Sequence, residues 1–181
     1  WMREVGDHYE YIAVYVDDLM IASKNPNAIV EILMSIYKFK LKGNGPVSFH
    51  LGCDWFRDED GNLCFAPKKY IIKMIANYER LFGRKPKPAA SPLIKGDHPE
   101  LDDSAILDMA GVSIYQSLIG SCQWVIQIGR FDICTAVMTM SRFRVAPRTG
   151  HLDRVKRIIG YLSKMREGVI RIRTEEPDYS S

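Results

Sequence analysis

The chain has 181 residues, a length that allows one domain of good size or two small ones. Hydrophobic residues make up 46% of it, enough for a packed core, which argues against global disorder. The net charge of +3 is too small to indicate a partner by itself, and the cysteines form no Cys-x-x-Cys pair typical of zinc sites. No apolar run reaches the roughly 18 residues of a membrane span.

The stretch from Tyr11 to Ser23 has apolar residues on both sides of two adjacent carboxylates, Asp17 and Asp18. Val, Ile and Tyr favour strands and Asp-Asp suits a tight turn, so we predict a β-hairpin with both acids in its turn. Because its strands are apolar on both faces, we expect them to be buried, with the turn at the edge of a core. Paired carboxylates are ligands that suit magnesium, although a solvated surface turn is the alternative.

A helix is predicted after this hairpin, with Asn25 as its N-cap and Pro26 at its first position. It should run to the turn residues 43–46 and cover one face of the hairpin's sheet. Two strands follow, at 47–56 and 63–65, joined by an acidic turn. Gly52 in the first of them indicates either close approach of another backbone or a bulge.

Pro67 opens a second helix, whose apolar stripe from Ile71 to Phe82 is predicted to face the core. Three basic residues occupy the opposite stripe: Lys69, Lys73 and Arg80. The segment 83–100 contains four prolines. We expect it to be an extended or partly mobile linker between a hairpin-rich part and a helical part.

Three further helices are predicted, the first from Ser104 or Ser113 to Ile128, the others over 132–145 and 150–165. Residues 169–173 alternate like an edge strand. Between the first two helices, Arg130 and Asp132 are expected to form a structural salt bridge or cap rather than a catalytic pair, since no third titrating group lies nearby in sequence.

Positive charge is concentrated near the end of the chain. From Arg142 to Arg173 there are ten basic and two acidic residues, a balance of +8. On the last predicted helix, Arg154, Arg157 and Lys164 share a face with Tyr161, away from the apolar stripe. Such a face suits contacts with phosphates, although a merely solvated face is the alternative.

Several of these segments resemble reverse transcriptases of the Ty1/copia retrotransposon type. Tyr15-Val16-Asp17-Asp18 matches the YxDD motif, and the other matching segments follow in the family's order: Phe49-His50-Leu51-Gly52, Tyr115-Gln116-Ser117-Leu118, Arg130-Phe131-Asp132-Ile133, Ser141-Arg142-Phe143 and Gly160-Tyr161-Leu162. The resemblance covers the chain from Tyr11 to about Arg173. It departs from the family pattern at Phe131, where the family has proline.

The resemblance implies an α+β fold: a partial polymerase palm, made of antiparallel β-hairpins with a packed helix, followed by a helical thumb-like bundle. The half-palm would occupy residues 1–66 and the first thumb helix 67–82. A Pro-rich linker at 83–103 and a thumb or connection bundle at 104–167 would follow. Residues 168–181 would form an edge strand and a tail towards a ribonuclease H domain.

The implied activity is RNA-directed DNA polymerisation, in which two Mg²⁺ or Mn²⁺ ions roughly 4 Å apart assist attack by the primer 3′ hydroxyl. Asp17 would be a direct metal ligand and catalytic residue, supported by Asp18. The primer end or nucleotide would contact Tyr15, Val16, Leu51 and Gly52. The duplex backbone would contact Lys69, Lys73, Arg80, Arg154, Arg157 and Lys164.

The implied partners are an RNA template, a DNA primer, a deoxynucleoside triphosphate, and the palm-and-fingers half and ribonuclease H domain of the same polyprotein. The family has another catalytic Asp upstream, whereas residues 1–10 form a polar lead-in, so we expect the isolated chain to be inactive. The implied location is cytoplasmic, in virus-like particles, with no membrane. The alternative is a domesticated, non-catalytic module that binds nucleic acid or protein.

Overall fold

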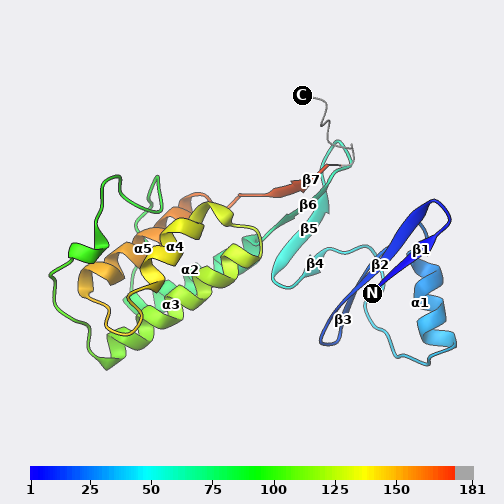
Figure 1. Ribbon diagram of the computed structural model, residues 1–181, viewed down its shortest axis with the longest axis horizontal. Coiled ribbons are helices and arrows are strands. Elements are labelled where there is room, and N and C mark those ends of the chain that lie inside the picture. The colour runs from blue at the N-terminus through cyan, green and yellow to red at the C-terminus, as the bar shows by residue number, and fades with distance from the viewer. Residues whose placement is uncertain (174–181) are drawn as a thin grey trace. The chain divides into compact units, whose positions relative to one another are not determined.

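The computed structural model describes residues 1–173, and the predicted tail beyond them lies outside the described residues. It confirms the α+β class, with helices and two antiparallel sheets (Figure 1). The chain divides into two compact units, Trp1–Val47 and Ser48–Ser181. The Pro-rich segment therefore lies inside the second unit. No helix within residues 1–173 is long and apolar enough to cross a membrane.

The first unit is a three-stranded antiparallel sheet with one helix. Strands β1 (Met2–Val5), β2 (His8–Tyr15) and β3 (Asp18–Ala22) lie in the order β1-β2-β3, and helix α1 spans Pro26–Ser35. The predicted helix start is confirmed, because Asn25 Oδ1 accepts a hydrogen bond from the Ala28 N–H at 3.3 Å and Pro26 opens the helix. The end differs, since α1 stops at Ser35, before the predicted turn at residues 43–46.

The expectation that the hairpin strands are buried is wrong within this unit. Only Glu10 and Ile29 are buried in it, and Val14 and Leu19 are exposed. Three strands and a ten-residue helix are too few to enclose a core, so strands that are apolar on both faces still show one face to solvent. The polar lead-in contains strand β1, which pairs with β2 along its whole length.

The second unit contains a four-stranded antiparallel sheet in the order β4-β5-β6-β7. Its strands are β4 (Phe49–His50), β5 (Cys53–Arg57), β6 (Leu63–Ala66) and β7 (Ile170–Ile172). The predicted edge strand near the end of the chain is confirmed as β7. The single strand predicted over 47–56 is wrong, because a two-residue turn at Leu51-Gly52 divides it into β4 and β5. Both turn residues have positive φ, 50° and 88°, as a type I′ hairpin requires.

Four helices form the core of this unit: α2 (Lys68–Phe82), α3 (Met109–Gln127), α4 (Cys134–Ser141) and α5 (Thr149–Lys164). Short 3₁₀ turns, η1 (Pro99–Leu101) and η2 (Phe131–Ile133), precede α3 and α4. The apolar residues of α3 that recur at spacings of three and four are all buried: Tyr115, Leu118, Ile119, Cys122 and Val125. The Tyr115 hydroxyl donates to the Met140 carbonyl at 2.6 Å and so ties α3 to α4.

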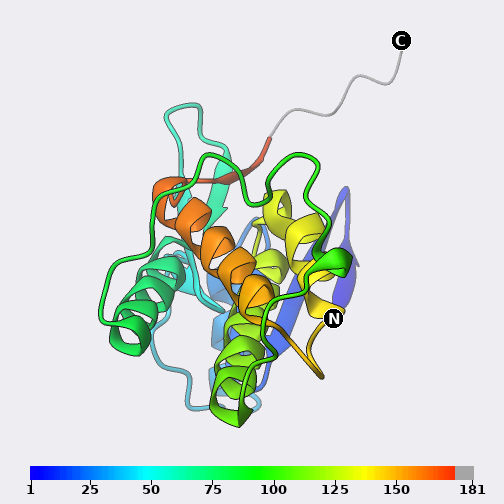
Figure 2. The same cartoon turned by 90° about the vertical axis from the view of Figure 1, so that its left-hand side faces the viewer.

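The Pro-rich segment is extended, as predicted, but it is held against α5. In Figures 1 and 2 this green segment runs along the outside of the helices. The Ala89 N–H donates to the Gly160 carbonyl at 3.3 Å. A Cβ on Gly160 would lie 2.0 Å from the Lys87 carbonyl oxygen, so glycine is needed for this close approach.

Candidate functional site

The acidic hairpin tip differs from the sequence prediction by one residue. Tyr15 pairs with Asp18, so Val16 and Asp17 form the turn and Asp18 begins β3. The prediction that both acids lie in the turn is therefore wrong, because the β2–β3 register fixes the turn more strongly than the turn preference of Asp. Val16 has a φ of 55°, which is rare for a β-branched residue and costs on the order of 1 kcal/mol.

Asp17 and Asp18 are both exposed. Val16, which precedes them in the chain, is 86% exposed. Within residues 1–173, no three His, Cys, Asp or Glu side chains are grouped so that they could hold a metal ion. The tip therefore offers at most two protein carboxylates. Magnesium in phosphate-transfer sites is commonly bound by one or two carboxylates, with substrate phosphates and waters completing its shell. The pair fits a cation that arrives with a phosphate substrate.

A buried acid near the base of the same hairpin was missed in the sequence. Glu10 on β2 accepts from Arg3 Nε at 3.0 Å and from the Ser23 hydroxyl at 2.6 Å. These hydrogen bonds, the Ser23 hydroxyl first, hold the pKa of Glu10 below its usual value. The three residues join β1, β2 and the end of β3. The sequence could have revealed this cluster only if β1 had been recognised as a strand, because Arg3 and Glu10 are then cross-strand partners.

The predicted primer-contact residues Leu51 and Gly52 belong to the second unit, where they form the β4–β5 turn. The turn packs against helix α3 of that unit. A Cβ added to Gly52 would be in van der Waals contact with the Trp124 side chain, 3.5 Å from its Nε1. Next to it, Cys53 Sγ donates to the Ile128 carbonyl at 3.3 Å. Gly52 is therefore a turn residue with positive φ, and neither a bulge nor a strand interior.

The basic stripe of α2 is exposed, as its spacing predicted. Lys69 pairs with Asp54 at 2.7 Å, and Arg80 donates to Asn77 Oδ1 at 2.7 Å. Lys73 is exposed and makes no hydrogen bond or ion pair with residues 1–173. Lys73 is therefore the member of the stripe that is most available to an external anion.

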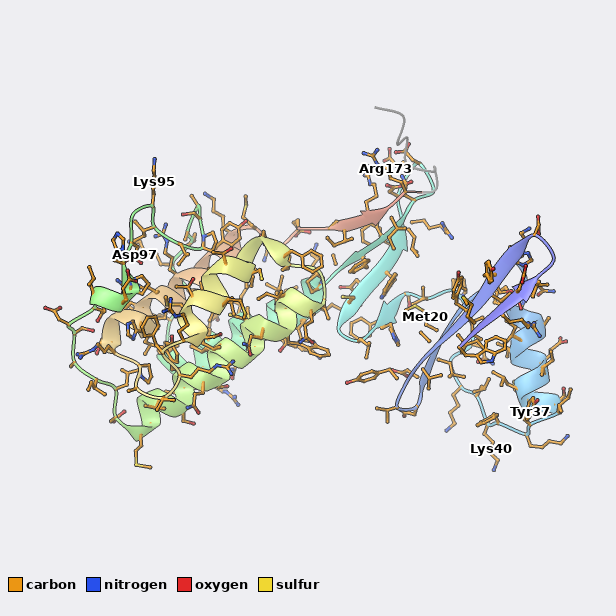
Figure 3. The ribbon with its side chains drawn as sticks, in the orientation of Figure 1. Met20, Tyr37, Lys40, Lys95, Asp97 and Arg173 are labelled. Atoms are coloured by element: carbon orange, nitrogen blue, oxygen red, sulfur yellow. The ribbon has the colours of Figure 1, made fainter. Side chains whose placement is uncertain are left out.

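The expected cationic face of α5 is largely absent. Arg154 is only 20% exposed; its Nε and Nη2 donate to Asp97 at 2.7 Å each, and its Nη1 donates to Asp102 at 2.5 Å. Hydrogen bonds from Ser104 and then Arg154 lower the pKa of Asp102 to about 2. Figure 3 shows Asp97 on the segment that runs beside α5. Arg154 is thus a structural residue that fastens this segment to the helix.

The other two basic residues of that predicted face differ in their exposure. Arg157 is partly buried and donates to Ser91 Oγ at 3.2 Å, so it too contacts the Pro-rich segment. Lys164 is exposed, as predicted. The partners of Arg154 and Arg157 lie 52 to 66 residues earlier in the chain, and a helical wheel cannot reveal such contacts.

The corner at Arg130 is structural, as predicted. Arg130 Nε and Nη2 donate to the two carboxylate oxygens of Asp132 at 2.9 and 2.7 Å. The Tyr161 hydroxyl donates to the same carboxylate at 2.8 Å. Burial opposes ionisation of Asp132, but the hydrogen bonds from Arg130 and Tyr161 outweigh it and lower the pKa of Asp132. Tyr161 is the third titrating group, which the local sequence did not show.

The concentration of positive charge near the end of the chain is therefore only partly available to a ligand. The exposed basic residues of this region are Arg142, Lys164, Arg166, Arg171 and Arg173. The start of α2 meets the connection that follows α5 through Lys68 and Glu167, whose Nζ and Oε2 atoms are 2.8 Å apart. The exposed lysines of α2 and the end of α5 thus belong to neighbouring elements of one unit.

Comparison with known proteins finds retroelement relatives. A protein of transposon Ty5-1 from Saccharomyces cerevisiae is 29% identical over 178 residues, covering 96% of this chain and 55% of the relative. The retrovirus-related Pol polyproteins from transposon TNT 1-94 of Nicotiana tabacum and transposon RE1 of Arabidopsis thaliana are 30% and 28% identical, over 86% and 87% of this chain. The chain spans only 12% and 10% of those two polyproteins.

These similarities support an origin of the chain in a retrotransposon polyprotein. No protein-family model matches the chain, and no solved structure matches it significantly.

Proposed function

We propose that the chain is part of an RNA-directed DNA polymerase of a copia-like retrotransposon, containing the second half of the palm and the thumb. The observation that carries the proposal is the Tyr15-Val16-Asp17-Asp18 hairpin tip, where one exposed carboxylate lies in a strained two-residue turn and the other begins the next strand. The similarity to retrotransposon Pol polyproteins along most of the chain supports it. The proposed location is the cytoplasm, in virus-like particles.

In this proposal Asp17 and Asp18 would hold Mg²⁺ or Mn²⁺ together with the phosphates of the incoming nucleotide. A bound ion would stabilise the developing charge and activate the primer 3′ hydroxyl. The chain's own contribution is positioning: the two-residue turn fixes Asp17, and pairing with Tyr15 fixes Asp18. Tyr15 and Val16 lie next to the acids and would contact the primer end or the nucleotide.

We expect a polypeptide of these 181 residues alone not to extend a primer, because the resemblance assigns another catalytic Asp and the fingers to an upstream segment. A longer polypeptide that also contains the segment encoded upstream should catalyse template-dependent extension. The measurement is incorporation of labelled nucleotide on an RNA template with a DNA primer. Detectable template-directed extension by the 181 residues alone would show that the assignment of parts is wrong.

Nucleic-acid binding can be tested on the chain itself. We expect micromolar binding to an RNA–DNA duplex without sequence preference, weakening steeply as salt rises because counterions are released. Reversing the exposed Lys73 and Lys164 to Glu should weaken binding about tenfold and reduce the salt slope by roughly two. Reversing Arg154 is unsuitable as a test, because it would place a third carboxylate beside Asp97 and Asp102.

The matched control is the double variant Lys85→Glu, Lys95→Glu. It makes the same change in net charge at two exposed lysines of the Pro-rich segment. Lys95 points away from the helices in Figure 3. Equal weakening by both double variants would mean that only net charge matters. An affinity unchanged between low and high salt would exclude a phosphate-binding surface. Duplex binding without extension by the lengthened polypeptide would favour a non-catalytic module.

A further inference from the structure

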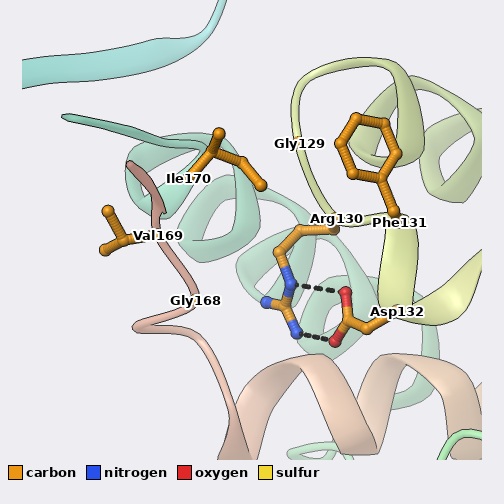
Figure 4. A pocket seen from close by; sticks show the side chains of 7 residues that line it. All are labelled: Gly129, Arg130, Phe131, Asp132, Gly168, Val169 and Ile170. Atoms are coloured by element: carbon orange, nitrogen blue, oxygen red, sulfur yellow. Dashed lines mark hydrogen bonds and ion pairs between the residues drawn. The ribbon is translucent and has the colours of Figure 1, made fainter. Parts of the chain in front are cut away.

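A pocket of about 230 Å³ lies between the η2 corner and the connection from α5 to β7 (Figure 4). It has no role in the polymerase proposal, and the inference below does not depend on that proposal. Its lining combines one ion pair with glycines and apolar side chains: Gly129, Arg130, Phe131, Asp132, Gly168, Val169 and Ile170.

The unusual feature of the pocket is an unused donor. The Arg130 side chain is 3% exposed, and its Nε and Nη2 are occupied by Asp132. Its Nη1 is buried and has no hydrogen-bond partner among residues 1–173. In Figure 4 this nitrogen points away from Asp132, towards the backbone at Gly168 and Val169. Buried donors are almost always paired in folded proteins, so an unpaired one indicates a missing acceptor.

The neighbouring charges indicate which kind of acceptor fits. Asp132 already neutralises Arg130, and its carboxylate forms part of the pocket wall. A phosphate or carboxylate ligand would be repelled by Asp132, with no further cation in the lining to compensate. An uncharged carbonyl oxygen accepts the same hydrogen bond without that repulsion.

The remainder of the lining suits a peptide. Phe131 and Val169 are 61% and 45% exposed and place apolar surface beside the donor. A Cβ on Gly168 would lie 3.1 Å from Arg130 Nε, so glycine leaves the guanidinium uncrowded on this side. Ile170 begins β7, an edge strand that pairs only with β6 in the described part of the chain. Extended peptides commonly bind at such edges.

We propose that this pocket binds a segment of extended polypeptide, with an uncharged main-chain carbonyl accepting from Arg130 Nη1. An apolar side chain of the same segment packs against Phe131 and Val169. The minimal probe is N-acetyl-leucine methylamide, which carries neutral peptide carbonyls beside one apolar side chain. With so few atoms its dissociation constant should be on the order of millimolar.

The test is an NMR titration of the ¹⁵N-labelled 181-residue chain with this probe. We expect saturable shifts of the Arg130 Nε–H signal and of the backbone amides at 129–132 and 168–170. Acetate and inorganic phosphate at equal concentration should shift these signals much less. Saturation by either anion but not by the methylamide would overturn the proposal in favour of an anion site. The absence of saturable shifts with all three would overturn it entirely.

A variant at the exposed rim avoids disturbing the ion pair. Val169→Asp should weaken binding of the probe about tenfold, because it removes apolar contact and adds a charge that must be desolvated. The matched control is Val145→Asp, at an exposed valine outside the pocket lining, which should bind like the unaltered chain. A folded Val169→Asp variant with unchanged affinity would contradict the proposal.

Discussion

Replacing Arg154 with Met should lower the free energy of unfolding by about 3 kcal/mol. The substitution removes the cation that Asp97 and Asp102 share and leaves both mostly buried carboxylates without it. Breaking a buried pair in this way costs about 3–5 kcal/mol, and the partial exposure of this site favours the lower end. Met keeps most of the aliphatic contacts. Urea unfolding followed by circular dichroism would measure the change.

The control for this loss is Lys156→Met. Lys156 lies on the same helix, pairs with the exposed Asp153 and lies 5.0 Å from the centre of the Phe82 ring, so its removal should change stability by no more than about 1 kcal/mol. Equal losses in the two variants would mean that the Arg154 network contributes no more than a surface ion pair.

The same network makes stability depend on acid pH. The pKa of Asp102 is lowered to about 2 and that of Asp97 is also lowered, whereas an unfolded Asp titrates near 4. The unfolded state therefore takes up protons first, and this stabilisation is lost as the pH falls from about 4 towards 2. Arg154→Met should flatten the slope of stability against pH in that window. An unchanged slope would contradict the assignment.

The largest effect on activity is expected at the hairpin tip. In a polypeptide long enough to polymerise, Asp17→Asn should lower the rate of nucleotide incorporation about 10³-fold, equivalent to roughly 4 kcal/mol of transition-state stabilisation. Because Asp17 is an exposed turn residue, the stability of the fold should change by no more than about 0.5 kcal/mol. Primer-extension rates and unfolding curves on the same preparations separate the two effects.

Asp7→Asn is the matched control, since Asp7 is an exposed acid in the β1–β2 turn of the same unit. It should retain nearly full activity. Near-normal extension by Asp17→Asn would remove Asp17 from the chemistry, and equal losses in both variants would indicate a general effect of charge.

The helical part of the fold could be predicted from the sequence, because its signals are local and repeated. The stripe from Tyr115 to Val125 recurs at spacings of three and four, and each of its members is buried. Asn25-Pro26 likewise combines a capping side chain with a residue suited to the first helical turn. The predicted ends of the helices were less accurate. The helix predicted to end at residue 145 ends at Ser141 in the structure.

The parts that could not be predicted depend on geometry or on distant partners. Leu51-Gly52 is a hairpin turn inside an apolar run, without the Asn-Gly or Asp-Gly pair that usually marks type I′ turns. The partners of Arg154 arrive from a segment more than 50 residues away, so a helix face that is basic in sequence is partly neutralised in the fold. For the candidate site, the sequence identified the acids of the tip but placed the turn one residue late.

Binding of Mn²⁺ to the 181-residue chain tests most directly whether the Tyr15–Asp18 tip is the metal-binding turn of a polymerase. Paramagnetic broadening of backbone amide signals should centre on residues 15–19, with an affinity on the order of millimolar because only two carboxylates are present. It should become stronger when a deoxynucleoside triphosphate is added and disappear in the Asp17→Asn, Asp18→Asn double variant. Broadening no greater at the tip than at the exposed acids Glu59 and Asp60, or unchanged in the double variant, would contradict the account.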